Sequence, residues 1–265
     1  MKIKSETDVN SRNNQNNSTF SLFQRFSFVS AFRRDMETFG LRKSLYNFSI
    51  KTINHIIFFK VLKCVIISTV DPRYLGDENE YEYSFLDPDI LFDLAKNEGN
   101  DLPLNFVQEA VEKGDECYGI LDGDSLASYG WYSNKPTLVT FGPAENDRES
   151  LWLHYAGDYI YMYNGYTHKN YRGQRLHAIG MTRALKGYLS RGFKGIVSYV
   201  ESNNFASLNS CYRMGYKDLG EIYILRIFGK YLLFHSKSCR KYEFRLITNA
   251  KTEKGIEQPY SPQER

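Results

Sequence analysis

Short blocks of alternating apolar and polar residues fill the second half of the chain, and turn-forming residues separate them. Alternation with a period of two is typical of a strand that buries one face. A block rich in β-branched and aromatic residues at 56–69 predicts one earlier strand. On this basis we expect further strands at 117–121, 125–132, 159–166, 195–200, 221–228 and 231–234.

Other blocks repeat apolar residues every three or four positions, which is the period of a helix with one buried face. Such helices are expected at 89–96, 104–113, 174–190 and 206–214. A glycine follows the last three of these blocks, and glycine commonly ends a helix. Because strands alternate with helices in the second half, the pattern predicts an α/β (α+β) fold built on a mostly open sheet.

The N-terminal region differs from the rest of the chain. Residues 1–19 are rich in Asn and Ser and predict a disordered tail. Residues 20–52 mix Phe, Leu and Met with Arg and Lys, which predicts a basic amphipathic helical segment that breaks near Gly40. Its apolar face packs on the following domain, or else makes weak contact with a membrane surface. The domain is expected over 53–247, followed by a flexible tail at 248–265.

The formal net charge of +3 hides an uneven distribution along the 265 residues. Residues 1–63 carry eleven Lys or Arg against four Asp or Glu, residues 64–124 carry three against sixteen, and residues 125–265 carry twenty against eleven. A protein that binds nucleic acid along its whole length would be basic throughout, so the acidic middle argues against that partner. The aromatic share of 15% favours strands and large cores but indicates no particular reaction.

The four cysteines lie far apart and form no C-x-x-C pair. We therefore expect reduced thiols, no disulfide framework and no bound metal. The N-terminal residues lack the apolar stretch of a secretory signal. Polar residues also interrupt the most apolar run, 53–70, so it does not have the composition of a membrane span. These features predict a cytoplasmic protein.

The segment from Thr167 to His177 joins a predicted strand to a predicted helix and is rich in cations. The first N–H groups of a helix have no acceptors within it, so the start of a helix attracts anions. Lys169, Arg172 and Arg175 add positive charge at the same place. The segment predicts an anion site, with an ordinary basic turn on a surface helix as the alternative.

Two runs carry a resemblance to a known family. YRGQRL at 171–176 resembles the pyrophosphate loop of the GNAT superfamily of acyl-CoA-dependent N-acyltransferases. NFASLNSCYRMGY at 204–216 resembles the sequence on the helix after that family's fifth strand. The resemblance is specific over 158–216 and implies a GNAT-like mixed open sheet, splayed at the cofactor strand, with helices on both faces. The N-terminal helical segment is then an addition to the family's fold.

The resemblance implies that acetyl-CoA, or another acyl-CoA, binds as a co-substrate. Backbone N–H groups of the cofactor strand would pair with pantetheine and polarise the thioester carbonyl. Gly165 also fits a β-bulge that splays the sheet. The cofactor-binding positions implied are Gly165, Tyr166, Thr167, Tyr171, Arg172, Gly173, Gln174, Arg175, Leu176, His177, Asn204 and Ser207.

The loop departs from the family pattern at three positions. Arg175 stands where the family prefers glycine, His177 where it prefers glycine or alanine, and Lys169 where a proline is usual. Glycine lets a backbone approach a diphosphate closely. We expect Arg175 to take ordinary helical geometry and to replace that approach with a charge-assisted contact. The bulkier His177 is expected to narrow the cofactor cleft.

The family often uses a tyrosine to protonate the departing thiolate of coenzyme A, and that position is Cys211 in this chain. Neighbouring helical residues point about 100° apart, so Tyr212 cannot occupy the same spot. Cys211 is a candidate general acid or else a small apolar filler, and Tyr212 is the reserve acid. The amine nucleophile needs help to lose a proton, and the candidate bases are Glu201, Asp158 and His154.

These motifs predict the transfer of an acetyl or other acyl group from acyl-CoA to a small-molecule or protein-borne amine by direct attack. A catalytically weak or inactive acyl-CoA-binding module is one alternative, because the loop is altered and the tyrosine is missing. A membrane-peripheral acyltransferase that uses longer acyl groups or acyl carrier protein is another. The acidic segment 71–124 covers the helices that line the acceptor side in this family, and it would attract a cationic amine or simply form a solvated face.

Overall fold

The computed structural model describes residues 30–76, 80–139 and 151–248. Contacts divide the chain into two compact units, residues 1–57 and residues 58–265. The predicted tails lie outside the described residues, except for Thr248 at the start of the second one.

Two helices make up the described part of the N-terminal unit. Residues 30–39 are helical, and α2 (Leu41–Ile56) follows after Gly40, whose φ is 81°. Within this unit the side-chain amide of Asn47 donates to Asp35 Oδ2 at 2.7 Å, so the two helices are hydrogen-bonded to each other. The predicted break near Gly40 is confirmed.

The second of these helices ends later than the hydrophobic pattern predicts. The N–H of Ile57 donates to the carbonyl of Ile53 at 2.9 Å, so the apolar residues up to Ile56 belong to the last helical turn. The first strand therefore begins at Phe58, and the predicted strand start at Ile56 is wrong by two residues. Within the ranges that the structure describes, no helix is long and apolar enough to cross a membrane.

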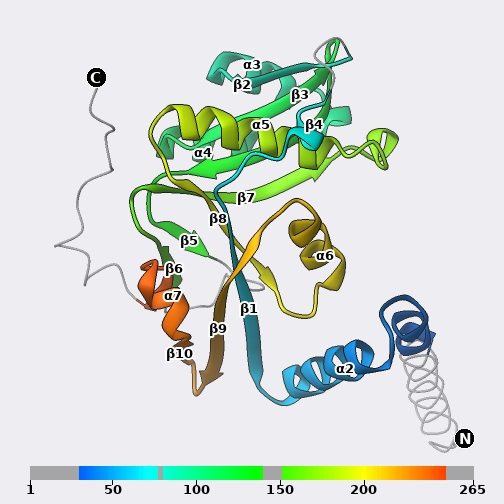
Figure 1. Cartoon of the computed structure of the whole chain (residues 1–265), viewed down its shortest axis with the longest axis vertical. Helices are drawn as coiled ribbons and strands as arrows, with labels where there is room; N and C mark the ends of the chain where they lie inside the picture. Colours follow the sequence, from blue (N-terminus) through cyan, green and yellow to red (C-terminus); the bar gives the residue numbers. More distant parts are fainter. Residues whose placement is uncertain (1–29, 77–79, 140–150, 249–265) are drawn as a thin grey trace, which may run out of the picture. The chain divides into compact units, whose positions relative to one another are not determined.

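An eight-stranded mixed sheet forms the centre of the second unit (Figure 1). Its strands, in chain order, are β1 (Phe58–Ile67), β2 (Glu82–Leu86), β3 (Glu116–Asp122), β4 (Ser125–Ser133), β7 (Tyr159–Thr167), β8 (Gly195–Glu201), β9 (Lys217–Ile227) and β10 (Lys230–His235). They lie in the order β10-β9-β1-β8-β7-β4-β3-β2. Every neighbouring pair is antiparallel except β7 and β8, which are parallel. The mixed open sheet is as predicted.

Several short strands were not predicted. β5 (Thr137–Val139), β6 (Leu151–His154) and β11 (Arg245–Thr248) form a separate three-stranded sheet, and β2 lies in the acidic segment 71–124, before the first helix predicted there. The three strands of the small sheet have three or four residues, and their sequences TLV, LWLH and RLIT show no regular alternation of apolar and polar residues. The small sheet shares a hydrophobic core with β1, β8 and β9, so tertiary packing stabilises it.

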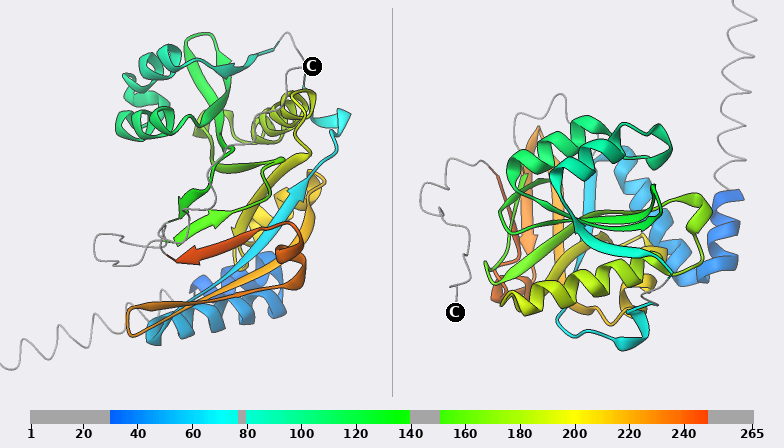
Figure 2. Two further views of the ribbon diagram at one scale, coloured as in Figure 1. Left: turned by 90° about the vertical axis from the view of Figure 1, so that its left-hand side faces the viewer. Right: turned by 90° about the horizontal axis from the view of Figure 1, so that it is seen from above.

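Helices cover both faces of the large sheet, as predicted. α3 (Pro88–Ala95) and α4 (Leu104–Lys113) lie on one face and α5 (Leu176–Ser190) on the other (Figure 2). The sequence of β4 explains this arrangement, because neighbouring strand residues point to opposite faces. Trp131 packs in the core under α3 and α4, whereas Tyr132 packs in the core under α5.

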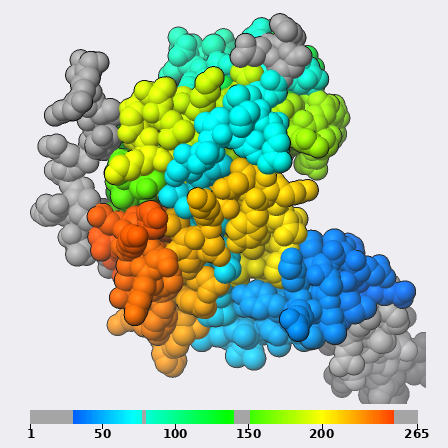
Figure 3. Space-filling model, viewed as in Figure 1, coloured from blue at the N-terminus to red at the C-terminus, as the bar shows by residue number. Residues whose placement is uncertain are grey.

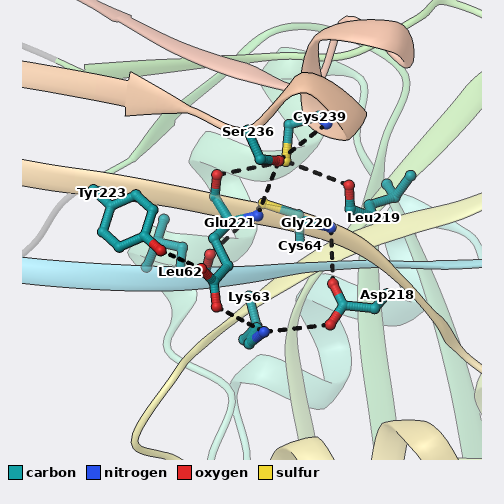
Figure 4. Close-up of polar contacts among 10 residues, drawn as sticks. All are labelled: Leu62, Lys63, Cys64, Asp218, Leu219, Gly220, Glu221, Tyr223, Ser236 and Cys239. Atoms are coloured by element: carbon teal, nitrogen blue, oxygen red, sulfur yellow. Dashed lines mark hydrogen bonds and ion pairs between the residues drawn. The ribbon is translucent and has the colours of Figure 1, made fainter.

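The helix that precedes β11 is hydrogen-bonded to the C-terminal strands of the large sheet. α7 (Lys237–Lys241) begins at Ser236, whose hydroxyl accepts from the amides of Cys239 at 3.3 Å and Glu221 at 3.2 Å (Figure 4). On β1, the ammonium of Lys63 pairs with the carboxylates of Glu221 at 2.7 Å and Asp218 at 3.4 Å. These contacts hold α7, β9 and β1 together beside β8. All four cysteines of the chain are free thiols.

Candidate functional site

The two parallel strands β7 and β8 diverge after a short paired stretch. They pair over only three residues, 159–161 against 195–197. Beyond this point β7 follows β4 and β8 follows β1. A cleft of about 540 Å³ opens between the diverging strands. In Figure 3 its mouth lies between the loop after β7 (yellow-green) and α6 (Phe205–Arg213, gold). The predicted splay at the cofactor strand is confirmed.

The cleft is lined by both strands, by the start of α5 and by α6 with the turn that follows it. β7 contributes seven consecutive residues, because the edge that faces β8 has no strand beside it there. The lining residues are Tyr161, Met162, Tyr163, Asn164, Gly165, Tyr166, Thr167, Arg172, His177, Ser198, Tyr199, Val200, Ser207, Ser210, Cys211, Met214 and Tyr216.

A bulge in β7 lies at the middle of the cleft. Tyr129 of β4 faces Tyr166 and Trp131 faces Tyr163, so β7 carries one extra residue between these pairs. Asn164 in this extra stretch has a φ of 45°. A Cβ on Gly165 would lie 2.5 Å from His177 Cε1, so only glycine fits beside the imidazole. The predicted bulge at Gly165 is confirmed, and the packing of His177 explains the glycine.

The loop between β7 and α5 has a different backbone conformation at Arg175 from the one expected from the sequence. α5 begins at Leu176, two residues later than predicted, and the residue before it, Arg175, has a φ of 63° in the left-handed region. Arg175 therefore does not take the ordinary helical geometry expected from the sequence. Glycine adopts this conformation without steric cost, which gives a conformational reason for the family's preference at this position. Gly173, with a φ of 88°, makes the other left-handed turn of the loop.

The start of α5 presents free amides toward the loop. The first helical hydrogen bond runs from the N–H of Ile179 to the carbonyl of Arg175 at 3.0 Å, so the three preceding amides have no acceptor within the helix. Arg172 lines the cleft beside them, and its Nε donates to the carbonyl of Thr167 at 3.3 Å. A guanidinium and unpaired helix amides together make a suitable anion site.

Other residues of the predicted loop make contacts outside the cleft. The Tyr171 hydroxyl donates to Asp122 at 2.9 Å, and Gln174 accepts from the Tyr81 hydroxyl at 2.5 Å. Leu176 is buried in the core. Gly173, Arg175 and Asn204 do not line the cleft either. Of the predicted cofactor positions, the cleft brings together Gly165, Tyr166, Thr167, Arg172, His177 and Ser207.

His177 is a half-buried residue in the cleft wall. Desolvation lowers the pKa of its imidazole, because burial penalises the charged form. The ring packs over Gly165, so it occupies space in the middle of the cleft. This geometry agrees with the expected narrowing by a bulky residue at this position.

The two candidate acids have different surroundings. Cys211 lines the cleft, and burial raises the pKa of its thiol to about 11. Tyr212 is 42% exposed and lines a separate groove with Ala206, Asn209 and Arg213. The geometry therefore gives Tyr212 no access to the cleft, in line with the 100° turn between neighbouring helical residues.

None of the candidate bases lines the cleft. The carboxylate of Glu201 pairs with the ammonium of Lys60 at 2.7 Å, and that of Asp158 pairs with Lys194 at 2.5 Å. His154 is 5% exposed on β6. The two ion pairs and the burial of His154 support structural roles for the three residues, and the arrangement gives no support to Glu201 as a base.

Sequence reasoning missed an aromatic group at the vertex of the cleft. The rings of Tyr161 and Tyr199 stack at 6.0 Å between centroids with 16° between their planes, and Tyr161 stacks on Tyr163 at 5.7 Å and 12°. The signal was the alternating tyrosines of β7, which place Tyr161 and Tyr163 on one face. Tyr199 belongs to this aromatic group only because β8 lies parallel to β7, which the sequence does not show.

No protein-family model matches the sequence, and no curated protein sequence matches it. Solved structures with a similar fold include an acetyltransferase of the GNAT family from Colwellia psychrerythraea, at 13% identity over 68% of this chain and 57% of that one, with a TM-score of 0.38. A GCN5-related N-acetyltransferase-like protein from Streptococcus suis is 14% identical over 66% of this chain and 67% of that one, with a TM-score of 0.42.

A conserved protein of unknown function from Staphylococcus epidermidis is similar to the same degree, at 11% identity over 65% of this chain and 64% of that one, with a TM-score of 0.42. The matched part of this chain spans between 53% and 67% of the length of five such structures.

The fold class follows from this chain's own topology. The sheet splays between its two parallel strands, the bulge lies in the first of them, and the basic loop leads from that strand into α5. Helices cover both faces of the sheet. This is the arrangement that the resemblance implies, so the second unit has a GNAT-like fold.

Proposed function

We propose that the protein transfers an acyl group from an acyl-CoA to an amine by direct attack of the amine on the thioester. The observation that carries this proposal is the end of the β7–β8 pairing at Tyr161 and Val197. The early end of pairing leaves an unpaired strand edge, a cleft and an anion site in one continuous space.

The two ends of the cleft suit different parts of an acyl-CoA. At the mouth, Arg172 and the first amides of α5 would hold the diphosphate. Along the cleft, the β8-side edge of β7 offers backbone groups to the amides of pantetheine, and N–H groups near Gly165 would polarise the thioester carbonyl. The thioester would then lie near the vertex, beside the tyrosines.

Direct attack requires a neutral amine. A lysine-like amine with a pKa of about 10.4 is almost entirely protonated at pH 7, so desolvation in the cleft has to favour the neutral form. Attack on the carbonyl carbon forms the C–N bond, the attacking nitrogen then loses one proton, the C–S bond breaks, and the leaving thiolate accepts a proton, so that the products are an amide and a free thiol. Cys211, with a thiol pKa of about 11, is a weaker acid than an ordinary thiol of pKa about 8.5, so it is a poor donor for that proton.

The surroundings of Cys211 and Tyr212 favour a second candidate function, a non-catalytic module that binds acyl-CoA. In that case the cleft and anion site are used for binding alone, and Cys211 is a neutral filler. A membrane-peripheral enzyme with longer acyl donors would use the same cleft and would be tethered through residues 20–50. Unchanged liposome co-sedimentation after deletion of residues 1–50 would contradict the tether.

Two measurements on the full chain test the proposal. Free CoA is expected to raise Tm, because a ligand at 100 times its Kd adds about 2.7 kcal/mol to the free energy of unfolding. Thiol release from acetyl-CoA is then measured with a series of primary amines. A rise in Tm without thiol release favours the binding module, and no rise at millimolar CoA contradicts both functions.

A further inference from the structure

Tyr163 is placed between the cleft and a buried carboxylate. It lines the vertex of the cleft, and its ring packs in the core under α4, with its centroid 6.4 Å from that of Phe106. Its hydroxyl donates to Asp115 Oδ2 at 2.6 Å. Asp115 is 9% exposed and follows the C-terminal cap of α4 at Gly114. Residues 48 positions apart thus form one hydrogen-bonded pair, of which Tyr163 is part of the cleft wall.

The direction of this hydrogen bond fixes what Tyr163 can recognise. A phenol has one proton to donate, and a carboxylate only accepts. Because the proton of Tyr163 is used in the bond to Asp115, the hydroxyl oxygen has only lone pairs left for another partner. Burial and the neighbouring carboxylate both raise the pKa of Tyr163, so the phenol keeps this proton. The hydroxyl therefore suits a hydrogen-bond donor and not an acceptor.

The charges around Asp115 also favour a hydrogen-bond donor as the partner of the Tyr163 hydroxyl. The amide of Asp115 donates to the carbonyl of Ala110 at 3.0 Å, so the carboxylate lies at the negative end of α4. The segment that contains α3 and α4, residues 64–124, carries sixteen acidic against three basic side chains. The Lys135 ammonium donates to the carbonyl of Lys113 at 2.7 Å at the same helix end, so the carboxylate of Asp115 is the negative group that faces Tyr163, whereas Arg172 at the mouth of the cleft favours an anion.

From this geometry we propose that Tyr163 accepts a hydrogen bond from the N–H of the acceptor amine, and that Asp115 holds Tyr163 in the accepting orientation. The inference rests on the proposed function and adds the residues that recognise the nucleophile. An N–H bonded to Tyr163 turns the nitrogen lone pair away from the phenol, and the thioester would lie beside it at the vertex. Asp115 is a positioning residue, because it acts through Tyr163.

The test is steady-state kinetics of thiol release with 1,4-diaminobutane and with aniline as acceptors. Tyr163→Phe is expected to lower kcat/KM at least 10-fold with 1,4-diaminobutane, mainly through KM. Asp115→Asn is expected to lower it at least as much, because an amide NH₂ can donate to the phenol and turn the Tyr163 proton into the cleft. With aniline, which is neutral at pH 7, the loss in Asp115→Asn is expected to be smaller.

Two variants outside the cleft serve as matched controls. Tyr129→Phe removes a hydroxyl that donates to the carbonyl of Asp101 under the same helices, and Glu116→Gln removes a negative charge on the α5 side of the sheet, where the carboxylate pairs with Arg191 at 2.9 Å. Both controls are expected to stay within 3-fold of the wild type. The rise in Tm with CoA is expected to be equal in all variants, which separates loss of amine recognition from loss of folding.

A variant that combines Tyr163→Phe with Asp115→Asn tests directly whether Asp115 acts through Tyr163. If Asp115 acts through Tyr163, adding Asp115→Asn to Tyr163→Phe changes kcat/KM by less than 3-fold. If the losses in kcat/KM of the two single variants multiply in the double variant, the inference is overturned. It is also overturned if both single variants turn over both amines like the wild type. No turnover by the wild type with any amine would instead overturn the proposed function, and the inference with it.

Discussion

The N-termini of α5 and α6 both border the cleft, and they differ in the partners of their first backbone N–H groups. α6 begins at Asn204, whose side-chain oxygen accepts from the amide of Ser207 at 3.2 Å. The left-handed Arg175 precedes the first residue of α5 and forms no side-chain cap. One helix satisfies an N-terminal donor with its own side chain, whereas the other leaves its donors for another partner.

This difference indicates which side of the cleft binds the anion. The amides of α5 lie beside the guanidinium of Arg172, and both helices contribute small or polar residues to the cleft wall. The basic residue of α6, Arg213, instead lines a separate groove. We therefore expect changes at the start of α5 to affect ligand binding, and changes at the start of α6 to affect mainly stability.

The largest expected effect is on the affinity for CoA. Arg172→Ala removes a charge-assisted contact of about 1.5–3 kcal/mol, so the Kd for CoA is expected to rise at least 10-fold. Isothermal titration calorimetry measures the Kd, and Arg213→Ala is the matched control on the other helix. Equal losses in the two variants would show that general surface charge, and not the start of α5, attracts the ligand.

A change in the strand next to α5 is expected to reduce stability. Gly165→Ala places a Cβ 2.5 Å from His177 Cε1 and 2.7 Å from Met162 Cε. Overpacking of this kind costs about 1–3 kcal/mol in the free energy of unfolding, measured by urea denaturation. The double variant Gly165→Ala/His177→Ala is expected to recover most of the loss relative to His177→Ala alone. Simple additivity would contradict the close packing of the imidazole on the strand.

At the start of α6, the expected effect is on stability alone. Asn204→Ala removes the cap and is expected to lower the free energy of unfolding by about 1 kcal/mol. Asn204→Asp keeps an acceptor at the same place and serves as the control in the same thermal scan. If Asn204→Ala weakened CoA binding more than 3-fold while Asn204→Asp did not, the start of α6 would also belong to the ligand site.

The smallest expected effect has the opposite sign. Arg175→Gly relieves a left-handed conformation that costs a side chain about 1–2 kcal/mol, while glycine makes the unfolded chain more flexible by about 0.4–1 kcal/mol. A small net rise in Tm is therefore expected. If the Kd for CoA changes less than 3-fold as well, the backbone conformation at Arg175 matters more than its charge.

Local patterns predicted the elements that border the site. The hairpin of β3 and β4, the helices α3, α4 and α6, and the parallel strands all lie within a few residues of their predicted bounds. Each has enough residues to show a period or a turn signal. β5, β6 and β11 have three or four residues without a regular alternation of apolar and polar positions, and the end of α2 was missed because Ile53 and Ile56 suit a strand as well as a helix.

The candidate site was predicted in part. Arg172 and Ser207 line the cleft, as the two motifs imply, while Tyr212 and Glu201 do not. A motif gives the position of a residue along the chain, and the side on which its side chain lies depends on the packing of the helix or strand. The structure therefore supports an anion site at the start of α5 and leaves the predicted acid, Cys211, in the cleft with a raised pKa.

The sequence by itself predicted the longer strands and helices along the chain and the loop at 171–176, because these depend mainly on neighbouring residues. The glycine at 165 indicated a bulge, but the register against β4 and the contact with His177 are tertiary features. Only the tertiary structure decided that β1 lies between β8 and β9 and that Tyr163 meets Asp115. It also decided that Arg175 is left-handed. Contacts between distant residues depend on the order of strands in the sheet, and many sheet orders are compatible with one pattern of apolar and polar residues.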